Sequence, residues 1–560
     1  DLVYPNADAW ASAYFAIYDP NGNYVTGNNC YAEYNGCQAN VGSTLAGTYS
    51  VVVTPPGNGG RTMSFKSTLS ADVTGTLTVN TAKALSVTRR GQNGRLTFSG
   101  TAGQTVALRV TNQSTGPTGR DVYYTVLAPD GSSVGSMTAT SEGTLNLPGL
   151  PASGTYTVFV DPNYGETVSS SVLVASGVTG TLATGGATGS YGTTVPGQNV
   201  YLTFTATAGQ NLGVGLSDLV YPNADAWTSA YLTIYDPNGS YVTGSSCYVE
   251  YRGCQANVGN ALAGTYSVVI TPPSSGDRTM SFKSTLSADS TGSLTVNTAK
   301  ALSVTRRGQN GRLTFSGTAG QTVALRVANQ TTGPADRDVY YTVLAPDGSS
   351  VNSMSVHTEG TLNLAGLPAS GTYTVFVDPN YGETVSSSVL VASGVTGTLA
   401  TGGATGSYST TVPGQNVYLT FTATAGQNLG FGLSDLVASG ANYLNLAIFN
   451  PDGSYAANPS CYPSYDGCQV NLPSAVAGTY NVVIYAPSEG DRTMSFKSTL
   501  SADVAGTLTV NTTKALSVTR RGQNGRLTFS GTAGQTLTLQ VTGQTLSLIH
   551  ISEPTRQEAI

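Results

Sequence analysis

The sequence predicts an all-β fold, made of tandem antiparallel β-sandwich domains of the Ig-like or jelly-roll-like kind in a semi-rigid rod. Three observations predict it. The composition, with 68 glycines and only 10% charged residues, suits sheets and turns better than helices. Apolar and polar residues alternate in short runs that are bounded by turn sequences. These features also recur along the chain at fixed spacing, which is typical of a repeat protein.

The repetition has two levels. Asp1, Asp218 and Asp435 each open the tripeptide Asp-Leu-Val, so the sequence repeats every 217 residues. A second duplication lies inside each repeat, because the tripeptide Gly-Thr-Tyr recurs in steps of 107 to 110 residues. These steps predict a structural unit of about 108 residues, long enough to bury its own core. The tyrosines that end the tripeptide are Tyr49, Tyr156, Tyr266, Tyr373 and Tyr480.

Each unit carries the signals of short strands. In the stretch 197–210, Val200, Leu202 and Phe204 alternate with Tyr and Thr, which is the period of a half-buried strand. The sequences Asp-Pro-Asn-Gly, Ala-Pro-Asp-Gly and Asn-Pro-Asp-Gly separate apolar runs and predict tight turns. No helical period persists anywhere in the chain. We therefore expect seven or eight strands in each unit.

Two kinds of unit alternate, and only type 1 carries cysteines. Unit boundaries are expected just before the recurring Thr-Gly-Thr-Leu sequence and its variants, with no flexible linker between units. The predicted domains are type 1 at 1–73 (truncated), 179–290 and 396–504, type 2 at 74–178, 291–395 and 505–545 (truncated), and a tail at 546–560.

Both ends of the chain differ from those of a complete protein. The tail, LSLIHISEPTRQEAI, has no counterpart in the earlier copies of the same region and resembles translated sequencing adapter. The opening Asp-Leu-Val recurs at residue 218 in the middle of a unit, and no initiator Met or leader precedes it. We expect a metagenomic fragment of a longer protein, with a non-native tail at 546–560.

The order of the motifs carries a resemblance to a known family. LTFTATAGQ, the AYLTIYDPNG hairpin and AGTYSVVI follow one another as in bacterial pre-peptidase C-terminal β-sandwiches, and the likeness covers essentially residues 1–545. RLTFSGTAGQ and SGTYTVFVDP are similar to repeats of very large secreted proteins, some of them upstream of YD-repeat regions. The resemblance implies an extracellular accessory module with no active site of its own. No protease domain is attached in this chain.

The cysteines form three local pairs, each with six intervening residues. A zinc site needs four nitrogen or sulfur ligands, whereas each type 1 unit supplies two cysteines without a histidine. A redox dithiol is usually Cys-x-x-Cys at a helix N-terminus. A disulfide that closes a short loop fits the even number, the local pairing and an oxidising, extracellular compartment. The predicted bridges are Cys30–Cys37, Cys247–Cys254 and Cys461–Cys468.

Aromatic residues accompany the cysteine loops. Two tyrosines recur inside each loop, while the residue before the glycine changes from Asn35 to Arg252 to Asp466. A position whose charge changes sign between copies does not suit a specific ligand contact, so the aromatic rings are the candidates. They either cover the disulfide or contact a glycan or protein partner. The candidate ligand-contact residues are Tyr31, Tyr34, Tyr248, Tyr251, Tyr462, Tyr465, Trp10 and Trp227.

Two further motifs have a structural and a functional interpretation. The loop DPNYGET offers oxygen ligands that would suit Ca²⁺, although the full calcium-loop pattern is absent and a plain turn is the alternative. The loop VTRRGQNGR groups Arg89, Arg90 and Arg95; without a wider basic field it predicts a solvated or interdomain salt-bridging loop instead of a phosphate site. The weak calcium candidates are Asp161, Asn163, Glu166, Asp378, Asn380 and Glu383; no other metal or cofactor is expected.

Composition and motif content exclude several classes of function. The chain carries 24 Lys+Arg against 30 Asp+Glu, which disfavours nucleic-acid and membrane-surface binding, and it has no apolar run of spanning length. Before the tail its only histidine is His357, and the preceding repeat has Thr140 there, so a histidine-based catalytic site is not expected. We expect no enzyme in this segment.

The remaining function classes are structural or adhesive. The leading hypothesis is a repetitive extracellular stalk or a fibre-forming, self-associating region of a large bacterial surface or secreted protein. One alternative is an adhesin-type binding module whose type 1 aromatic loops contact glycan or protein. The other is an accessory region of a secreted enzyme or toxin whose catalytic domain lies outside this chain.

Overall fold

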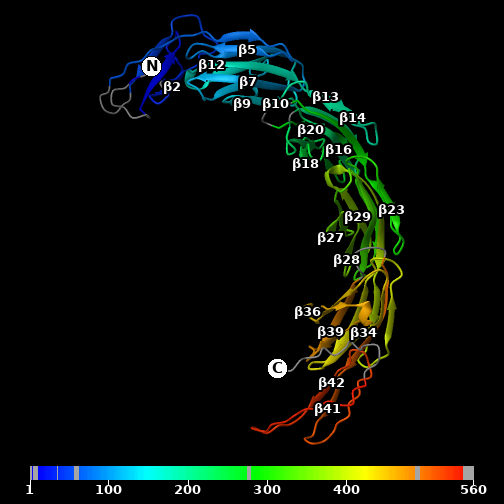
Figure 1. Cartoon of the computed structure of the whole chain (residues 1–560). Helices are drawn as coiled ribbons and strands as arrows, with labels where there is room; N and C mark the ends of the chain where they lie inside the picture. The colour runs from blue at the N-terminus through cyan, green and yellow to red at the C-terminus, as the bar shows by residue number, and fades with distance from the viewer. Residues whose placement is uncertain are drawn as a thin grey trace. The chain divides into compact units, whose positions relative to one another are not determined.

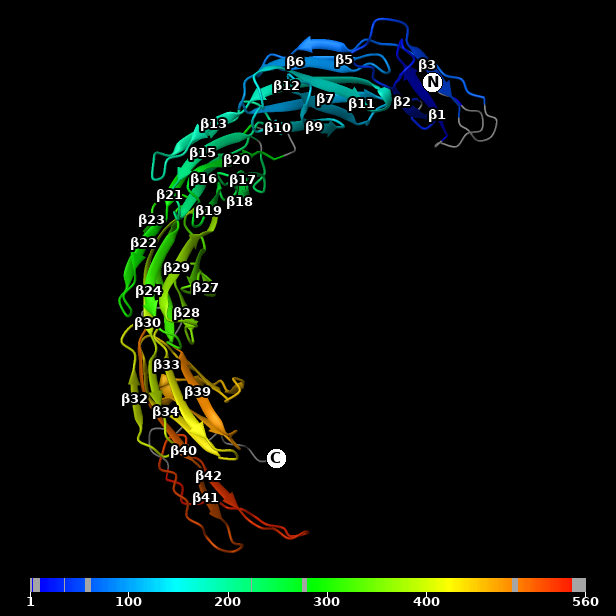
Figure 2. The ribbon, with the colours of Figure 1, turned by 180° about the vertical axis from the view of Figure 1, so that it is seen from behind.

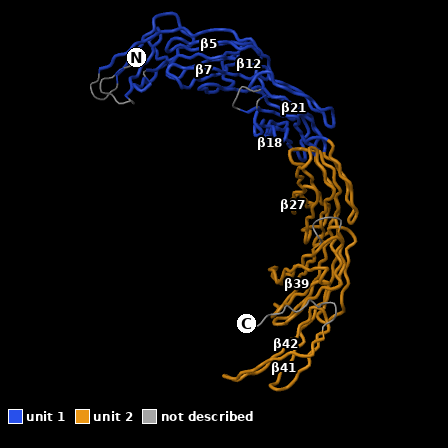
Figure 3. The backbone as a smooth tube through the Cα atoms, in the orientation of Figure 1, with its two compact units in different colours: residues 1–288, 306–309 blue, residues 289–305, 310–560 orange. Residues whose placement is uncertain are grey.

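The computed structural model describes residues 3, 11–34, 36–55, 62–222, 224–273, 279–485 and 492–545. The chain forms two compact bodies, which are coloured separately in Figure 3. Body 1 comprises residues 1–288 and 306–309, and body 2 comprises residues 289–305 and 310–560. We name the repeat units modules 1 to 6, with bounds 1–71, 72–177, 178–288, 289–394, 395–502 and 503–545.

Body 1 contains modules 1 to 3, and Figures 1 and 2 show its strands from two sides. Module 1 has β1 (Ser12–Tyr18), β2 (Tyr24–Tyr31) and β3 (Ser50–Thr54). Module 2 has β4 (Val73–Thr76), β5 (Lys83–Val87), β6 (Gly94–Gly100), β7 (Val106–Gly116), β8 (Val122–Leu127), β9 (Ser133–Ala139), β10 (Gly143–Leu147), β11 (Gly154–Pro162), the short helix η1 (Asn163–Gly165) and β12 (Thr167–Ser176). Module 3 has β13 (Val178–Thr181), β14 (Gly189–Gly192), β15 (Val200–Ala206), β16 (Leu212–Val220), β17 (Ser229–Tyr235), β18 (Tyr241–Tyr248), β19 (Cys254–Val258), β20 (Gly264–Thr271) and β21 (Ser281–Ala288).

Body 2 contains modules 4 to 6. Module 4 has β22 (Ser290–Ser293), β23 (Lys300–Val304), β24 (Gly311–Gly317), β25 (Val323–Gly333), β26 (Val339–Leu344), β27 (Ser350–Val356), β28 (Gly360–Leu364), β29 (Gly371–Pro379), η2 (Asn380–Gly382) and β30 (Thr384–Ser393). Module 5 has β31 (Val395–Thr398), β32 (Gly406–Ser409), β33 (Val417–Ala423), β34 (Leu429–Ala438), β35 (Leu444–Phe449), β36 (Tyr455–Ala457), β37 (Ser460–Cys461), η3 (Pro463–Tyr465), β38 (Cys468–Leu472), β39 (Gly478–Tyr485) and β40 (Met494–Ala502). Module 6 has β41 (Val504–Thr507) and β42 (Gly525–Thr528).

A complete module consists of two sheets that enclose one core. In module 3 the five-stranded sheet runs β13-β15-β20-β17-β18 and the four-stranded sheet runs β14-β21-β16-β19. The apolar positions of each strand face the other sheet, so Val200, Leu202 and Phe204 are buried, as the alternation predicts. Module 2 has the same plan, with sheets β4-β6-β11-β8-β9 and β10-β7-β12-β5.

The tyrosine of the recurrent Gly-Thr-Tyr sequence lies at the centre of the core. Tyr156 is fully buried, its ring stacks on Phe98 with 5.3 Å between centroids, and its hydroxyl donates to the Ala152 carbonyl at 2.7 Å. In module 3, Tyr266 stacks on Phe204 at 5.0 Å. The buried hydroxyl needs this partner, because an unpaired one would cost free energy. In the complete modules the repeated tripeptide therefore marks a packing and hydrogen-bonding requirement.

The all-β class is as predicted, with 54% of the residues in strands and 2% in helices. The predicted arrangement, tandem antiparallel β-sandwich domains in a semi-rigid rod, is wrong, because the chain is arranged as a β-solenoid with stacked coils. Successive modules are stacked into continuous bodies, in the manner of solenoid proteins, and residues 306–309 of module 4 belong to body 1. The pairing is also mixed: β4 pairs parallel with β6, because β5 crosses to the other sheet between them.

Candidate functional site: the joints between modules

Each disulfide closes a tight loop at one end of a type 1 module. Cys247 is the penultimate residue of β18 and Cys254 begins β19, and the structure joins all three predicted cysteine pairs. Both sulfurs of this pair are buried. Gly253 has φ +146°, and a Cβ placed there would lie 2.0 Å from the Leu216 carbonyl oxygen. Only glycine permits this approach of the loop to β16.

The loop 306–309 of module 4 packs against this end of module 3. Gly308 has φ +75° and lies against β16, so close that a Cβ on Gly213 would be 1.7 Å from the Gly308 carbonyl oxygen. Thr285 of β21 donates its hydroxyl to the Arg307 carbonyl at 2.7 Å. In body 2 the corresponding contact joins Gly430 and Gly522, where a Cβ on Gly430 would lie 1.6 Å from the Gly522 carbonyl oxygen. The backbone-to-backbone seat is therefore a repeated feature.

Arginine side chains fasten the same loop to the disulfide loop. Arg90 donates to the Tyr34 carbonyl oxygen at 3.0 Å, Arg307 to that of Tyr251 at 2.9 Å, and Arg521 to that of Tyr465 at 3.1 Å. A charged donor makes these hydrogen bonds stronger than neutral ones.

The arginine before each of the last two adds further hydrogen bonds. Arg306 donates to Ser287 at 3.0 Å and to the Gly186 carbonyl at 2.6 Å, and Arg520 donates to Ser501 at 2.9 Å. Arg95 instead pairs with Asp72 at 2.5 Å and covers the Phe159 ring. The predicted arginine cluster is thus divided between the joint and the start of its own module.

A Gly-Gln-Asn sequence lies at every joint, and its role was not predicted from the sequence. The glycine has a positive φ of 75° to 79° in all five copies, at Gly91, Gly197, Gly308, Gly414 and Gly522. The glutamine that follows donates its side-chain amide to a carbonyl at the end of the preceding module. These pairs are Gln92–Ala71, Gln198–Ser176, Gln309–Ala288, Gln415–Ser393 and Gln523–Ala502.

At the joint of modules 1 and 2 the DPNYGET loop also contacts the disulfide loop. Tyr164 stacks on Tyr34 with 3.9 Å between centroids, and Arg120 lies 5.3 Å from the Tyr34 ring. Asp161 accepts hydrogen bonds from Gln38 and Asn40 of module 1. The tyrosine predicted to cover the loop or contact a partner is therefore covered by the next module.

The acidic groups of this loop are held by protein groups. Glu166 is completely buried, with one carboxylate oxygen 3.5 Å from the Arg120 guanidinium. Burial raises the pKa of Glu166, and the charges of Arg120 and Arg90 oppose that shift. Burial likewise raises the pKa of Asp161 against the hydrogen bonds of Gln38 and Asn40.

The second copy of the DPNYGET loop has the same placement in module 4. Asp378 lies near the end of β29, Asn380 opens η2 and Asn163 opens η1. Glu383 is buried, 3.6 Å from Arg337. Within the described residues no cluster of three or more His, Cys, Asp or Glu could hold a metal ion.

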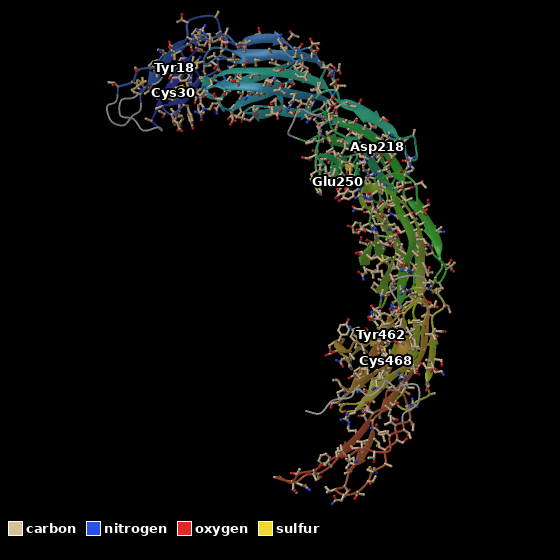
Figure 4. All side chains as sticks on the ribbon, viewed as in Figure 1. Tyr18, Cys30, Asp218, Glu250, Tyr462 and Cys468 are labelled. Atoms are coloured by element: carbon tan, nitrogen blue, oxygen red, sulfur yellow. A yellow bond between two sulfur atoms is a disulfide. The ribbon has the colours of Figure 1, made fainter. Side chains whose placement is uncertain are left out.

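The other aromatic candidates form edge-to-face pairs around the disulfide loops. The ring centroids of Tyr31–Tyr34, Tyr248–Tyr251 and Tyr462–Tyr465 lie 5.8 to 6.1 Å apart. Trp227 is 65% exposed and packs edge-on against Tyr248, while Trp10 lies outside the described residues. In module 5, which lacks the tryptophan, Tyr443 takes that position beside Tyr462 at 6.0 Å. Figure 4 labels Tyr462 together with Cys468 of the same loop.

His357, the single histidine before the tail, makes a local contact with an aspartate. His357 is exposed, and its Nδ1 lies 3.3 Å from Asp338. In module 2 the equivalent Thr140 donates to the equivalent Asp121 at 2.8 Å. The two side chains thus make the same contact, which explains why this position accepts either residue.

Comparisons with known proteins assign the chain to no family. No family model and no curated protein matches the chain. Among solved structures, Lac15 from a marine microbial metagenome is 14% identical over 53% of this chain and 84% of its own, with a TM-score of 0.12. Tripeptidyl Peptidase 2 is 9% identical over 52% and 32%, with a TM-score of 0.14. Sulfolobus Turreted Icosahedral Virus is 13% identical over 60% and 87%, with a TM-score of 0.13.

Scores this low carry no conclusion about fold or function. Three disulfides are compatible with an extracellular protein. None of the helices in the described part of the chain is long and apolar enough to cross a membrane.

Proposed function

We propose that this chain is a spacer: a repetitive extracellular stalk segment of a large bacterial surface or secreted protein, in which the joints transmit load from module to module. The single observation that supports this proposal most is the recurrence of the Gly-Gln-Asn contact at five joints. A flexible string of modules would need no such contact, whereas a spacer that holds its ends apart does.

The composition of the joints supports the same proposal. Glycine backbones in direct contact leave no room for slippage, and an arginine ties each disulfide loop to the following module. The disulfide closes the loop whose carbonyl oxygen accepts the arginine hydrogen bond, so this loop stays folded when force acts along the chain. The spacer would be placed at the cell surface or in a secreted fibre.

A deletion of one full repeat tests this proposal. Removing residues 218–434 joins Ser217 to Asp435 and preserves the local sequence Leu-Ser-Asp-Leu-Val. The maximum particle dimension from small-angle X-ray scattering should fall in proportion to the modules removed, while the melting temperature stays unchanged. A maximum dimension that stays the same after the deletion would contradict a spacer role.

A further inference from the structure

The outer face of the sheet that contains β17 in module 3, and of the corresponding sheets in modules 1 and 5, carries a group of aromatic rings that the joints do not use. In module 3, Leu232 and Ile234 of β17 point into the core, so Tyr231 and Tyr235 point outward. Tyr241 of the neighbouring strand β18 is paired with Tyr235. We name the three outward rings Tyr231, Tyr235 and Tyr241 the tyrosine platform of module 3.

The platform is held in place by specific contacts. A Cβ on Gly244 would lie 2.7 Å from the Tyr231 hydroxyl and 3.0 Å from its ring, so this glycine leaves the space in which the ring lies along β18. Tyr231 and Tyr241 are joined by a side-chain hydrogen bond. Tyr235 and Tyr241 meet edge to face at 6.5 Å. Rings fixed in this way lose little conformational entropy when a ligand packs on them.

The same construction recurs in module 1, where Figure 4 labels Tyr18. The Tyr14 and Tyr24 hydroxyls are 3.0 Å apart, and Tyr18 and Tyr24 meet edge to face at 6.1 Å. Gly27 again leaves room for the Tyr14 ring, with 2.6 Å between a placed Cβ and the hydroxyl.

In module 5 the rings are rearranged but kept. Asn445 occupies the position of Tyr231, and its pairing partner on β39 is Tyr485 where module 3 has Thr271. Phe449 and Tyr455 pack at 4.7 Å. An aromatic ring lost on one strand is thus supplied by the adjacent strand, and the platform of module 5 is Phe449, Tyr455 and Tyr485.

The platform lies on a sheet without charge. None of the five strands of this sheet in module 3 contains Asp, Glu, Lys or Arg, and neither does any of the six strands in module 5. The nearest acidic residue along the hairpin, Asp236, is occupied by the backbone N–H groups of Asn238 and Ser240 at 2.8 Å each. Thr271 and Ser267 of β20 are the pairing partners of Tyr231 and Tyr235 and offer hydroxyls beside the rings.

We propose that the tyrosine platforms of modules 1, 3 and 5 bind a neutral polysaccharide. The C–H faces of a pyranose ring pack on aromatic faces, and its hydroxyls match the Ser, Thr and Tyr hydroxyls around them. A charged partner would find no counter-charge on this sheet. A second copy of the chain would have to desolvate the hydroxyl rows without new partners, which costs free energy.

Repetition strengthens the argument for a polymeric ligand. A polysaccharide offers the same unit many times, and three platforms in one chain convert the later binding events into intramolecular ones. The proposal goes beyond the spacer role, because a spacer with joints alone would need no exposed rings.

Affinity electrophoresis of the full chain tests the proposal. The gels contain mixed-linkage β-glucan or galactomannan as neutral probes and alginate as the anionic probe. The platform variant combines Tyr24→Thr, Tyr241→Thr and Tyr455→Thr, which remove rings that are 55%, 60% and 64% exposed. A matched control combines Tyr123→Thr and Tyr340→Thr, whose rings on type 2 modules are 45% and 48% exposed.

The unaltered chain should be retarded by at least one neutral probe and not by alginate. The platform variant should bind on the order of tenfold more weakly, the control should bind as the unaltered chain does, and both should keep its melting temperature. The proposal is overturned if neither neutral probe retards the unaltered chain, if only alginate does, or if both variants bind equally. It is also overturned if sedimentation equilibrium shows that the platform variant loses self-association instead. None of these results bears on the particle dimension that tests the spacer.

Discussion

Gly213 and Gly308 lie closer to each other than any side chain would allow. Replacing Gly213 with Ala places a Cβ within 1.7 Å of a carbonyl oxygen, so the loop 306–309 must move away from β16. We expect Gly213→Ala to lower the free energy of unfolding by about 1–3 kcal/mol in urea, as overpacking does. The control Gly149→Ala, with open space around its Cβ, should leave it nearly unchanged. Equal effects of the two substitutions would mean that the contact between Gly213 and Gly308 does not stabilise the protein.

Tyr34 and Tyr164 form the closest ring stack described in the chain. A double-mutant cycle with Tyr34→Ala and Tyr164→Ala should give a coupling energy of about 0.5–1.5 kcal/mol, measured by urea unfolding. The control cycle pairs Tyr164→Ala with Tyr18→Ala, since Tyr18 packs on Tyr24 instead. A coupling energy of zero for Tyr34 and Tyr164 would show that their stacking does not stabilise the joint.

Glu166 should make the stability of the joint between modules 1 and 2 depend on pH. Burial raises its pKa above the ordinary value of 4.5, so the folded protein holds this proton more tightly than the unfolded chain does. Its charged form therefore costs stability at neutral pH, and that cost disappears as the pH falls through the folded pKa towards 4.5.

Glu166→Gln measures this effect. The free energy of unfolding of the unaltered protein, relative to that of Glu166→Gln, should be lower at pH 8 than at pH 5. Urea unfolding of both proteins at both pH values gives the four free energies of unfolding that this comparison needs. The opposite sign would mean that Arg120, which lies 3.5 Å away, outweighs the burial of the carboxylate.

At the scale of strands and loops, the sequence predicts what depends on local pattern. Alternation placed the strand over residues 200–206, and the spacing of Cys247 and Cys254 indicated a loop staple. The parallel pairing of β13 with β15 was not predicted, because it depends on β14 crossing to the other sheet. The pairing of sheets is a property of the whole module and leaves no period in a single strand.

The joints were missed for a related reason. Arg90 and Tyr34 are 56 residues apart, and nothing in either stretch shows that they meet. The repeated Gly-Gln-Asn sequence did carry a signal, since a glycine that recurs before an amide at each module start suggests a positive φ and a side-chain hydrogen bond. The loop with Asp161 and Glu166 shows a related limit: carboxylates that would suit Ca²⁺ also make contacts between modules, so the sequence pattern alone does not separate the two roles.

The staple stabilises the element that receives the arginine. Replacing Cys247 and Cys254 with Ala should lower the stability of module 3 by about 2.5 kcal/mol, the chain-entropy value for a loop of this length. Because the Tyr251 carbonyl accepts from Arg307, the same change should speed proteolysis in loop 306–309. Mapping of cleavage sites by mass spectrometry checks this. Unchanged cleavage together with lower stability would show that staple and joint are independent.

At the scale of the whole molecule, the alternation of module types follows from the joints. The disulfide end of a type 1 module receives a type 2 loop that begins Arg-Arg-Gly, whereas type 1 modules carry Val-Pro-Gly at the same place. Removing residues 290–394 creates the sequence Asp-Val-Thr-Gly-Thr, which occurs naturally at residues 72–76, and puts Pro413 where Arg307 was. Module 3 then lacks the arginine that donates to the Tyr251 carbonyl. It also lacks the arginine that donates to the Gly186 carbonyl, because Val412 takes the place of Arg306. The whole-repeat deletion of residues 218–434 keeps the alternation and serves as the matched control.

We expect the chain without residues 290–394 to refold from urea in lower yield than the whole-repeat deletion, with the loss appearing as aggregate in size-exclusion chromatography. Two near-identical neighbours whose joint cannot close expose matching strands to each other, which favours strand exchange during folding. The melting of its modules should also separate into distinct calorimetric transitions, because a joint that is not formed cannot couple them. Equal refolding yields and a single shared transition in both deletions would show that module order has no bearing on assembly.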